Sequence, residues 1–170
     1  MKIRTSYFYQ IRHFKKNMIP ISTCLFDPDW FHNFTQDYSY IFYDNRHILN
    51  GLRLETIIEQ GRHSNHGPDI CPCESKNYQT CSFLKQYRDN LENINFNNMV
   101  QDMQKFANNY KENENIDEEI TLVLIVYEAP NNHCSERHAL QDYFTSHGIE
   151  CFELEYPIQQ FEIKKGEFRF

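Results

Sequence analysis

The sequence predicts an α/β fold with one domain over residues 1–170, built on a mostly parallel sheet. The main evidence is the segment from Ile120 to Leu154, which reads as strand, turn, helix and strand. Within it, Thr121 to Tyr127 is an unbroken apolar, β-branched run, as expected of a strand buried on both faces. Two amphipathic helical patterns and two further apolar runs lie earlier in the chain. Together these features predict a small Rossmann-like three-layer sandwich with an inserted loop rich in cysteine and histidine.

Two strands and a turn are expected in the first part of the chain. Lys2 to Phe8 reads as the first strand, and Ile19 to Phe26 reads as the second. Pro20 lies at the start of this second strand, where a missing backbone N–H costs least. Asp27 to His32 reads as a turn, and the residues from Asp37 to Glu55 are aromatic but follow no clear pattern.

Two amphipathic helices are expected in the middle of the chain. Apolar residues recur at helical spacing from Phe83 to Ile94 and again from Phe96 to Tyr110. A polar run from Lys111 to Glu119 links these helices to the central strand. The tail from Tyr156 to Phe170 alternates aromatic and charged residues, which predicts an edge strand or a segment that contacts a partner.

The last helix is expected from about Cys134 to Gly148, because apolar residues follow a helical spacing and a glycine ends the pattern. A short strand from Glu150 to Leu154 follows at once. In such a βαβ unit the turn after the first strand faces the ligand. Here that turn, Glu128 to His133, is polar, so it is the best candidate for a functional site.

The net charge of -7 argues against a protein that coats a nucleic-acid backbone, because phosphate contact needs clustered basic side chains. A basic cluster does lie between Lys2 and Lys16, and a solvated surface explains it equally well. No apolar stretch is long enough to span a bilayer, and the start of the chain lacks the apolar core of a signal peptide. We therefore expect a cytoplasmic protein whose cysteines are reduced or bind metal.

A metal site is expected in the polar segment from Glu59 to Cys81. Zinc is bound readily by three thiolates and one imidazole, and such a site would order a loop too polar to form its own core. The alternative is a set of reduced cysteines in an exposed loop. The predicted ligands of this structural zinc are His66, Cys71, Cys73 and Cys81.

Glu128 stands out because it follows the carboxyl end of a buried strand. Carboxylates at this position commonly bind ribose hydroxyls or act as an acid or base. The alternative is a salt bridge from Glu128 to Arg12 or Arg137. The sequence contains no G-x-G-x-x-G and no Walker A motif, which excludes a standard dinucleotide or ATP-hydrolysing site.

The start of the last helix offers a second kind of chemistry. Its unpaired N–H groups suit a phosphate or carboxylate, and Arg137 would add a bidentate contact. The same position would lower the thiol pKa of Cys134. In the structural alternative, Ser135 only caps the helix and Cys134 is a buried thiol.

Two segments resemble a known family. Lys2 to Arg12, KIRTSYFYQIR, resembles the opening strand and the "TSxFxxIR" motif of the DUF488 family of uncharacterised α/β proteins. Val126 to Cys134, VYEAPNNHC, resembles that family's C-x-E-x-P…C-H-R turn, with the glutamate and the second cysteine at matching separation. Val126 stands where the family has its first cysteine, and Ser135-Glu136 stands where it has His-Arg. The resemblance covers both ends of the chain and implies a compact α/β fold.

The resemblance also implies that both segments end at the same edge of the sheet, with amides, a carboxylate and aromatic rings around one pocket. Such a set suits a phosphorylated nucleoside, with the base against tyrosine or tryptophan. The ligand-binding residues expected from the turn and the resemblance together are Thr5, Ser6, Tyr9, Arg12, Trp30, Glu128, Asn131, Asn132, Cys134, Ser135 and Arg137.

Three functions are consistent with these features, and the sequence leaves the oligomeric state open. The first is binding of a nucleotide or nucleotide-derived small molecule, as in a viral or mobile-element protein that sequesters a signalling nucleotide. The second is a hydrolase or glycosyl-transferring enzyme that uses Glu128. The third is a protein-interaction module whose surface is the phenylalanine-rich tail and the cysteine loop.

Overall fold

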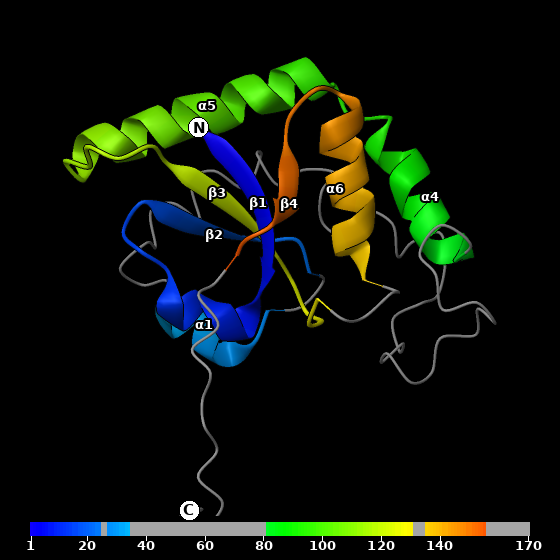
Figure 1. Cartoon of the computed structure of the whole chain (residues 1–170), viewed down its shortest axis with the longest axis horizontal. Coiled ribbons are helices and arrows are strands. Elements are labelled where there is room, and N and C mark those ends of the chain that lie inside the picture. Colours follow the sequence, from blue (N-terminus) through cyan, green and yellow to red (C-terminus); the bar gives the residue numbers. More distant parts are fainter. Residues whose placement is uncertain (25–26, 35–80, 131–134, 156–170) are drawn as a thin grey trace, which may run out of the picture.

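The computed structural model of the chain describes residues 1–24, 27–34, 81–130 and 135–155, which form a parallel sheet with helices on both faces (Figure 1). The elements are β1 (Lys2–Tyr7), η1 (Phe8–His13), β2 (Met18–Ser22), α1 (Asp29–Phe34), α4 (Ser82–Leu91), α5 (Phe96–Asn113), β3 (Thr121–Val126), α6 (Glu136–Ser146) and β4 (Cys151–Glu153). The predicted α/β class is therefore confirmed.

The described sheet has four strands in the order β2-β3-β1-β4, and every neighbouring pair is parallel. In the register of β1 with β3, Lys2 lies opposite Thr121 and Tyr7 lies opposite Val126. The two central strands therefore end at the same level. Their carboxyl ends form one edge of the sheet.

The strand β3 is buried on both faces, as its unbroken apolar sequence predicts. All six of its residues are buried, and their side chains alternate between two clusters. Leu122 and Leu124 pack with α5 and α6 on one face. Val123 and Ile125 pack on the other face, against apolar residues of η1 and α1. The result is a three-layer arrangement with β3 at its centre.

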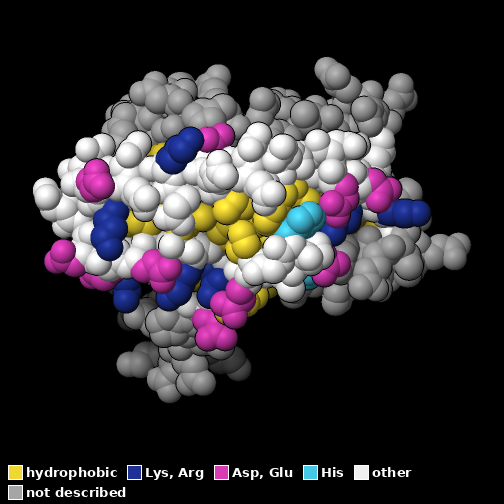
Figure 2. Space-filling model, turned by 90° about the horizontal axis from the view of Figure 1, so that it is seen from above, with side chains coloured by type: hydrophobic (Ala, Val, Ile, Leu, Met, Phe, Trp, Pro, Cys, Tyr) yellow, Lys and Arg dark blue, Asp and Glu magenta, His cyan; other side chains and the backbone are white. Residues whose placement is uncertain are grey.

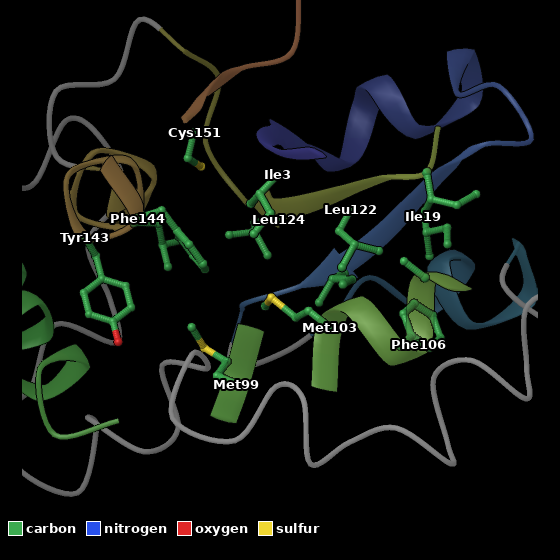
Figure 3. Close-up of a cluster of buried hydrophobic side chains, with 14 of the residues drawn as sticks. Ile3, Ile19, Met99, Met103, Phe106, Leu122, Leu124, Tyr143, Phe144 and Cys151 are labelled. Atoms are coloured by element: carbon green, nitrogen blue, oxygen red, sulfur yellow. The ribbon is translucent and has the colours of Figure 1, made fainter. Parts of the chain in front are cut away.

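The amphipathic helix α5 forms most of one outer layer. Figure 3 shows Met103 of this helix beneath Leu122 and Leu124 of β3, and Phe106 beneath Ile19 of β2. The predicted helix over 96–110 is confirmed and continues to residue 113. Its start is capped by a side chain, because Oδ1 of Asn95 accepts a hydrogen bond from the backbone N–H of Asn98 at 3.1 Å.

Hydrophobic side chains are only partly covered at the rim of this layer. Figure 2 views the molecule from the side of α5, and it shows a band of hydrophobic side chains bordered by charged ones. The partly buried apolar residues packed against the α5 core are Met1, Ile94, Phe96, Val100 and Ile149. The ring of Phe96 stacks on His147 at 4.2 Å, which shields part of this rim.

The connections leave the sheet on opposite faces for a topological reason. The connection from β1 to β2 passes across β3 in one direction, and its η1 segment packs on the face with Val123. The connection from β3 to β4 crosses β1 in the other direction, and its helix α6 packs on the opposite face. Crossovers between parallel strands are right-handed, so reversing the direction also reverses the face.

Two expectations about local structure are corrected. The expected turn at Asp27 to His32 is instead the entry to α1, which begins at Asp29. The ring that plugs the core there is Phe31, with 0% of its surface exposed, whereas Trp30 is 45% exposed. The second strand, expected over Ile19 to Phe26, instead runs over Met18–Ser22, and the backbone N–H of Cys24 donates to Oγ of Ser22 at 3.3 Å.

Some expectations concern residues outside the described ranges. These are the segment from Asp37 to Glu55, the inserted loop before Cys81, and the tail from Tyr156 to Phe170. Among the helices that are described, none combines the length and the apolar composition that crossing a membrane needs.

Candidate functional site

The topology points to a site between the carboxyl ends of β1 and β3. These two strands are neighbours, yet the chain leaves β1 toward one face and leaves β3 toward the other. In parallel α/β sheets, ligands bind in the crevice that such a switch point creates. Tyr7 and Val126 mark the last residues of the two strands, and Glu128 follows two residues later.

Arg137 is the buried centre of the polar groups at this edge. It lies in the first turn of α6, and only 1% of its surface is exposed. Its Nε lies 2.8 Å from Oε2 of Glu153, and its Nη2 donates to the backbone oxygen of Glu128 at 2.9 Å. Its Cζ lies 6.0 Å from the ring centre of Tyr7. Its Nη1 is buried and has no hydrogen-bond partner among the residues that the structure describes.

Glu153 joins this arginine to β1. Oγ1 of Thr5 donates to Oε2 of Glu153 at 2.9 Å, and Nε2 of Gln141 donates to Oγ1 of Thr5 at 2.6 Å. Burial raises the pKa of Glu153 above its ordinary value, although the Arg137 charge and the Thr5 hydroxyl oppose the shift. These contacts connect α6, β1 and β4 across the same face of the sheet.

Two carboxyl groups at the start of α6 lie close enough to share a proton. Glu136 is 4% exposed, and burial together with the nearby Glu128 carboxylate raises the pKa of Glu136 to about 8. Arg137 acts in the opposite direction. The protonated form of Glu136 is therefore favoured. Oε2 of Glu128 is buried and accepts no hydrogen bond from the described residues. A proton on the Glu136 carboxyl would give this oxygen a hydrogen-bond donor.

Tyr87 of α4 closes the buried side of this carboxyl pair. The pKa of its hydroxyl is raised well above the ordinary value, first by burial and then by Glu136 and Cys24. Burial thus favours the uncharged forms of both Tyr87 and Glu136.

Exposed aromatic rings surround the same edge. Phe8 is buried, and its ring contacts Tyr127 at 5.5 Å and Trp30 at 6.0 Å, with exposed fractions of 60% and 45% for the two outer rings. Tyr9, at 55% exposure, stacks on Tyr7 at 6.4 Å. Rings of this kind offer flat surfaces for stacking a base.

The structure brings together several of the residues that the sequence predicts. Thr5 and Arg137 join one hydrogen-bonded group, and Glu128 lies beside it. Ser135 is buried, and its Oγ accepts a hydrogen bond from the backbone N–H of Arg137 at 3.4 Å, so it caps α6 as the structural alternative predicts. Ser6 is also buried, and strand alternation directs its side chain to the opposite face from Thr5.

Neither of the expected ion pairs of Glu128 forms among the described residues. Arg137 pairs with Glu153 instead and contacts only the backbone of Glu128. Arg12 lies over the ring of Tyr9, with its Cζ 3.7 Å from the ring centre, and its Nε donates to the backbone oxygen of Tyr9. The carboxylate of Glu128 is therefore half-buried without an arginine partner in the described chain.

The remaining predicted site residues lie outside the described ranges, namely Asn131, Asn132, Cys134, His66, Cys71 and Cys73. Cys81 is described, and its buried thiol precedes α4. Within the described part of the chain, no group of three or more histidine, cysteine, aspartate or glutamate side chains is arranged to hold a metal ion. The zinc site thus stays a prediction.

The predicted set lacks the polar residues Glu136, Gln141 and Glu153 and the tyrosines Tyr7, Tyr87 and Tyr127. A signal for Glu153 is present in the sequence, because it shares a strand face with the apolar Cys151 two residues earlier. Glu136 offers no such signal. An acid in the first turn of a helix normally interacts with the helix dipole at the surface.

Compared with known proteins, the chain matches no family model, no curated protein and no solved structure. The resemblance to the DUF488 family therefore stays a prediction. The site rests on its own geometry.

Proposed function

We propose that this protein binds a nucleotide-derived small molecule, with the nucleoside part in the crevice between the carboxyl ends of β1 and β3. The observation that carries this proposal is the buried polar group at the switch point, where Nη1 of Arg137 has no partner among the described residues. A buried donor without an acceptor costs about 1–3 kcal/mol, and a ligand acceptor would remove that cost. Because Nη1 is covered, binding requires the side chains around it to move.

Ribose fits these groups because each hydroxyl both donates and accepts. One hydroxyl oxygen would accept from Nη1 of Arg137, and one hydroxyl would donate to the half-buried Glu128 carboxylate. The base would lie against an exposed ring such as Tyr127. Stacking of a base on an aromatic side chain is worth about 1–3 kcal/mol.

Native mass spectrometry of the purified protein tests this proposal directly. Denaturation should release a small molecule that contains a nucleoside, and the same spectrum tests for a retained zinc ion on the predicted cysteine loop. Calorimetry with added nucleosides gives the affinity. Glu128→Gln should weaken binding about tenfold or more, because a charged acceptor contributes roughly 1.5–3 kcal/mol to such a hydrogen bond.

A matched control is Glu118→Gln, which removes an exposed carboxylate on the loop before β3, at the amino edge of the sheet. It should leave the affinity unchanged. A protein that releases nothing and ignores all added nucleosides and nucleotides would rule out the proposal.

The shared proton favours a second candidate function, hydrolysis or transfer of a glycosidic bond. An uncharged carboxyl beside an ionised one is the arrangement that a general acid and its partner need. Glu136, with a pKa raised to about 8 by burial and by Glu128, would donate the proton to the leaving base as the glycosidic bond breaks. Glu128 would stabilise the positive charge that develops on the sugar, and water, or an acceptor hydroxyl in a transfer, would form the new bond to the sugar carbon and lose a proton.

Product analysis separates the two candidates. A nucleoside recovered unchanged after prolonged incubation supports binding, as expected of a protein that sequesters a signal. Release of free base supports the enzyme. Glu136→Gln should then abolish release, because an amide does not donate a proton to the leaving group, and it should leave nucleoside affinity within a few-fold of wild type.

A further inference from the structure

The start of α6 is a poor place for the phosphate of the proposed ligand. Arg137 is the cation there, and its charge is already balanced by Glu153 at 2.8 Å. The carboxyl groups of Glu128 and Glu136 lie at the same helix end. Even with one of them protonated, the carboxylates outnumber the guanidinium. The helix dipole contributes too little to overcome this excess of negative charge.

Arg12 offers the opposite electrostatic environment on the other side of the crevice. It is exposed, and no carboxylate of the described chain lies within ion-pair distance of it. Its guanidinium is nevertheless held in one place by two contacts. The Cζ lies 3.7 Å from the ring centre of Tyr9, and Nε donates to the Tyr9 backbone oxygen at 2.9 Å. Both Nη groups remain available for an anion, in a geometry suited to a bidentate contact.

A short series of contacts connects this arginine to the buried polar group. Arg12 lies over Tyr9, Tyr9 stacks on Tyr7 at 6.4 Å, and Tyr7 lies 6.0 Å from the Cζ of Arg137. The rings of Tyr9 and Tyr7 thus form a row of side chains that runs from the Arg12 guanidinium toward that of Arg137.

Resting on the proposed function, we propose that Arg12, held over Tyr9, binds the phosphate of the ligand, while the nucleoside lies toward Glu128 and Arg137. This assignment separates the charged end of the ligand from the carboxyl groups at α6. It also gives the protein a means of selecting phosphorylated nucleosides over free ones.

The test compares each of the four common ribonucleosides with its 5′-monophosphate by calorimetry. In the wild type, the monophosphate of the preferred base should bind about 10-fold to 100-fold more tightly than the nucleoside, as expected of a charge-assisted contact. Arg12→Gln should remove this preference and leave nucleoside affinity unchanged. Arg12→Lys should keep part of it, because the charge remains while the fork is lost.

The control variant is Lys105→Gln, which removes an exposed cation from α5 and should preserve the preference. A phosphate preference that survives in Arg12→Gln overturns this inference and leaves the proposed function standing. A wild-type protein that binds neither member of any pair overturns both. Circular dichroism and the unchanged nucleoside affinity establish that Arg12→Gln is folded.

Discussion

Arg137 carries its charge where almost none of its surface is exposed, and Glu153 balances that charge at 2.8 Å. Burying two charges is costly, so this pair contributes little net stability compared with apolar residues of the same size. Removing one partner is different, because the other charge remains in the protein without compensation.

Arg137→Met tests this asymmetry. The substitution keeps much of the side-chain volume and leaves the Glu153 carboxylate unpaired, so the free energy of unfolding should fall by about 3–5 kcal/mol. Urea denaturation measures the change. The double variant with Glu153→Gln should recover part of the loss. Additive losses in the double variant would contradict the pairing.

The carboxyl of Glu136 makes stability depend on pH. Its pKa is about 8 in the folded protein, against an ordinary value of 4.5 that applies to the unfolded chain. Between these values the folded state holds the extra proton, so the contribution of Glu136 to stability is fully present below pH 4.5 and is lost as the pH rises to 8. The slope for one proton is about 1.4 kcal/mol per pH unit.

Glu136→Gln should remove this dependence, because the amide resembles the protonated carboxyl. We expect the variant to be more stable than wild type at pH 8 and nearly equal to it at pH 5, as measured by urea denaturation at several pH values. The other titrating groups affect both proteins equally, so the difference in stability between wild type and variant reports Glu136 alone. A difference that does not change with pH would show that Glu136 is ionised in the folded state.

The sequence identifies some of these residues and not others. Glu128 is recognisable because the buried strand before it fixes its place at the carboxyl edge. Glu136 is not, because its burial arises only in the fold, where Tyr87 of α4, about fifty positions away in the chain, lies near enough for the Glu136 charge to raise the Tyr87 pKa. Local patterns carry no information about such a distant contact.

At the scale of elements, the helix α5 depends on its apolar stripe. Met103 is fully buried at the middle of the helix and packs against β3. Met103→Ala should destabilise the protein by about 2–5 kcal/mol, because it removes buried methylene groups and leaves a cavity. Gln101→Ala, on the exposed side of the same helix, should have little effect. Thermal and urea denaturation would measure both variants.

The elements that could be predicted are those with long or uniform patterns. The strand β3 and the helix α5 follow from six consecutive apolar residues and from a stripe of several helical turns. Shorter elements could not be predicted in the same way. The helix α1 has six residues, too few for a helical period to be distinguished from a turn.

At the scale of the whole molecule, β2 lies at one edge of the sheet among the described strands, where another chain could pair with it. The backbone oxygen of Asn17 accepts from Thr121, and the backbone N–H of Thr23 donates to Ile125. Backbone groups point alternately to the two sides of a strand, so those of Ile19 and Ile21 point toward β3 and those of Pro20 point away from it. Pro20 therefore lacks an N–H on the side where another strand would pair.

Pro20→Val restores that N–H with a side chain of similar size. We expect the variant to associate more strongly than wild type as the concentration rises, which sedimentation velocity would detect. Met18→Val is the matched control. The backbone of Met18 faces away from β3 like that of Pro20, but it already has an N–H, so the substitution adds no hydrogen-bond donor. Identical sedimentation of wild type and Pro20→Val would show that the edge is protected by other means.

The class of fold could be predicted from the sequence, whereas the order of the strands could not. Apolar runs such as Thr121 to Val126 identify strands, but they do not say which strands are neighbours. The order β2-β3-β1-β4 depends on side chains that meet only after the chain has folded. The βαβ pattern predicts a site at the carboxyl end of β3, and the order of the described strands gives the physical reason for that place.

The same strand order has a consequence for the synthesis of this protein. β1 and β2 are made first, but they never touch, because β3 lies between them. Among the described strands, neither has a neighbour to pair with until β3 emerges, and β1 lacks its second neighbour until β4 follows. This sheet is therefore completed only after β4 is made, and the nascent β1 and β2 are open to chaperones until their partners emerge.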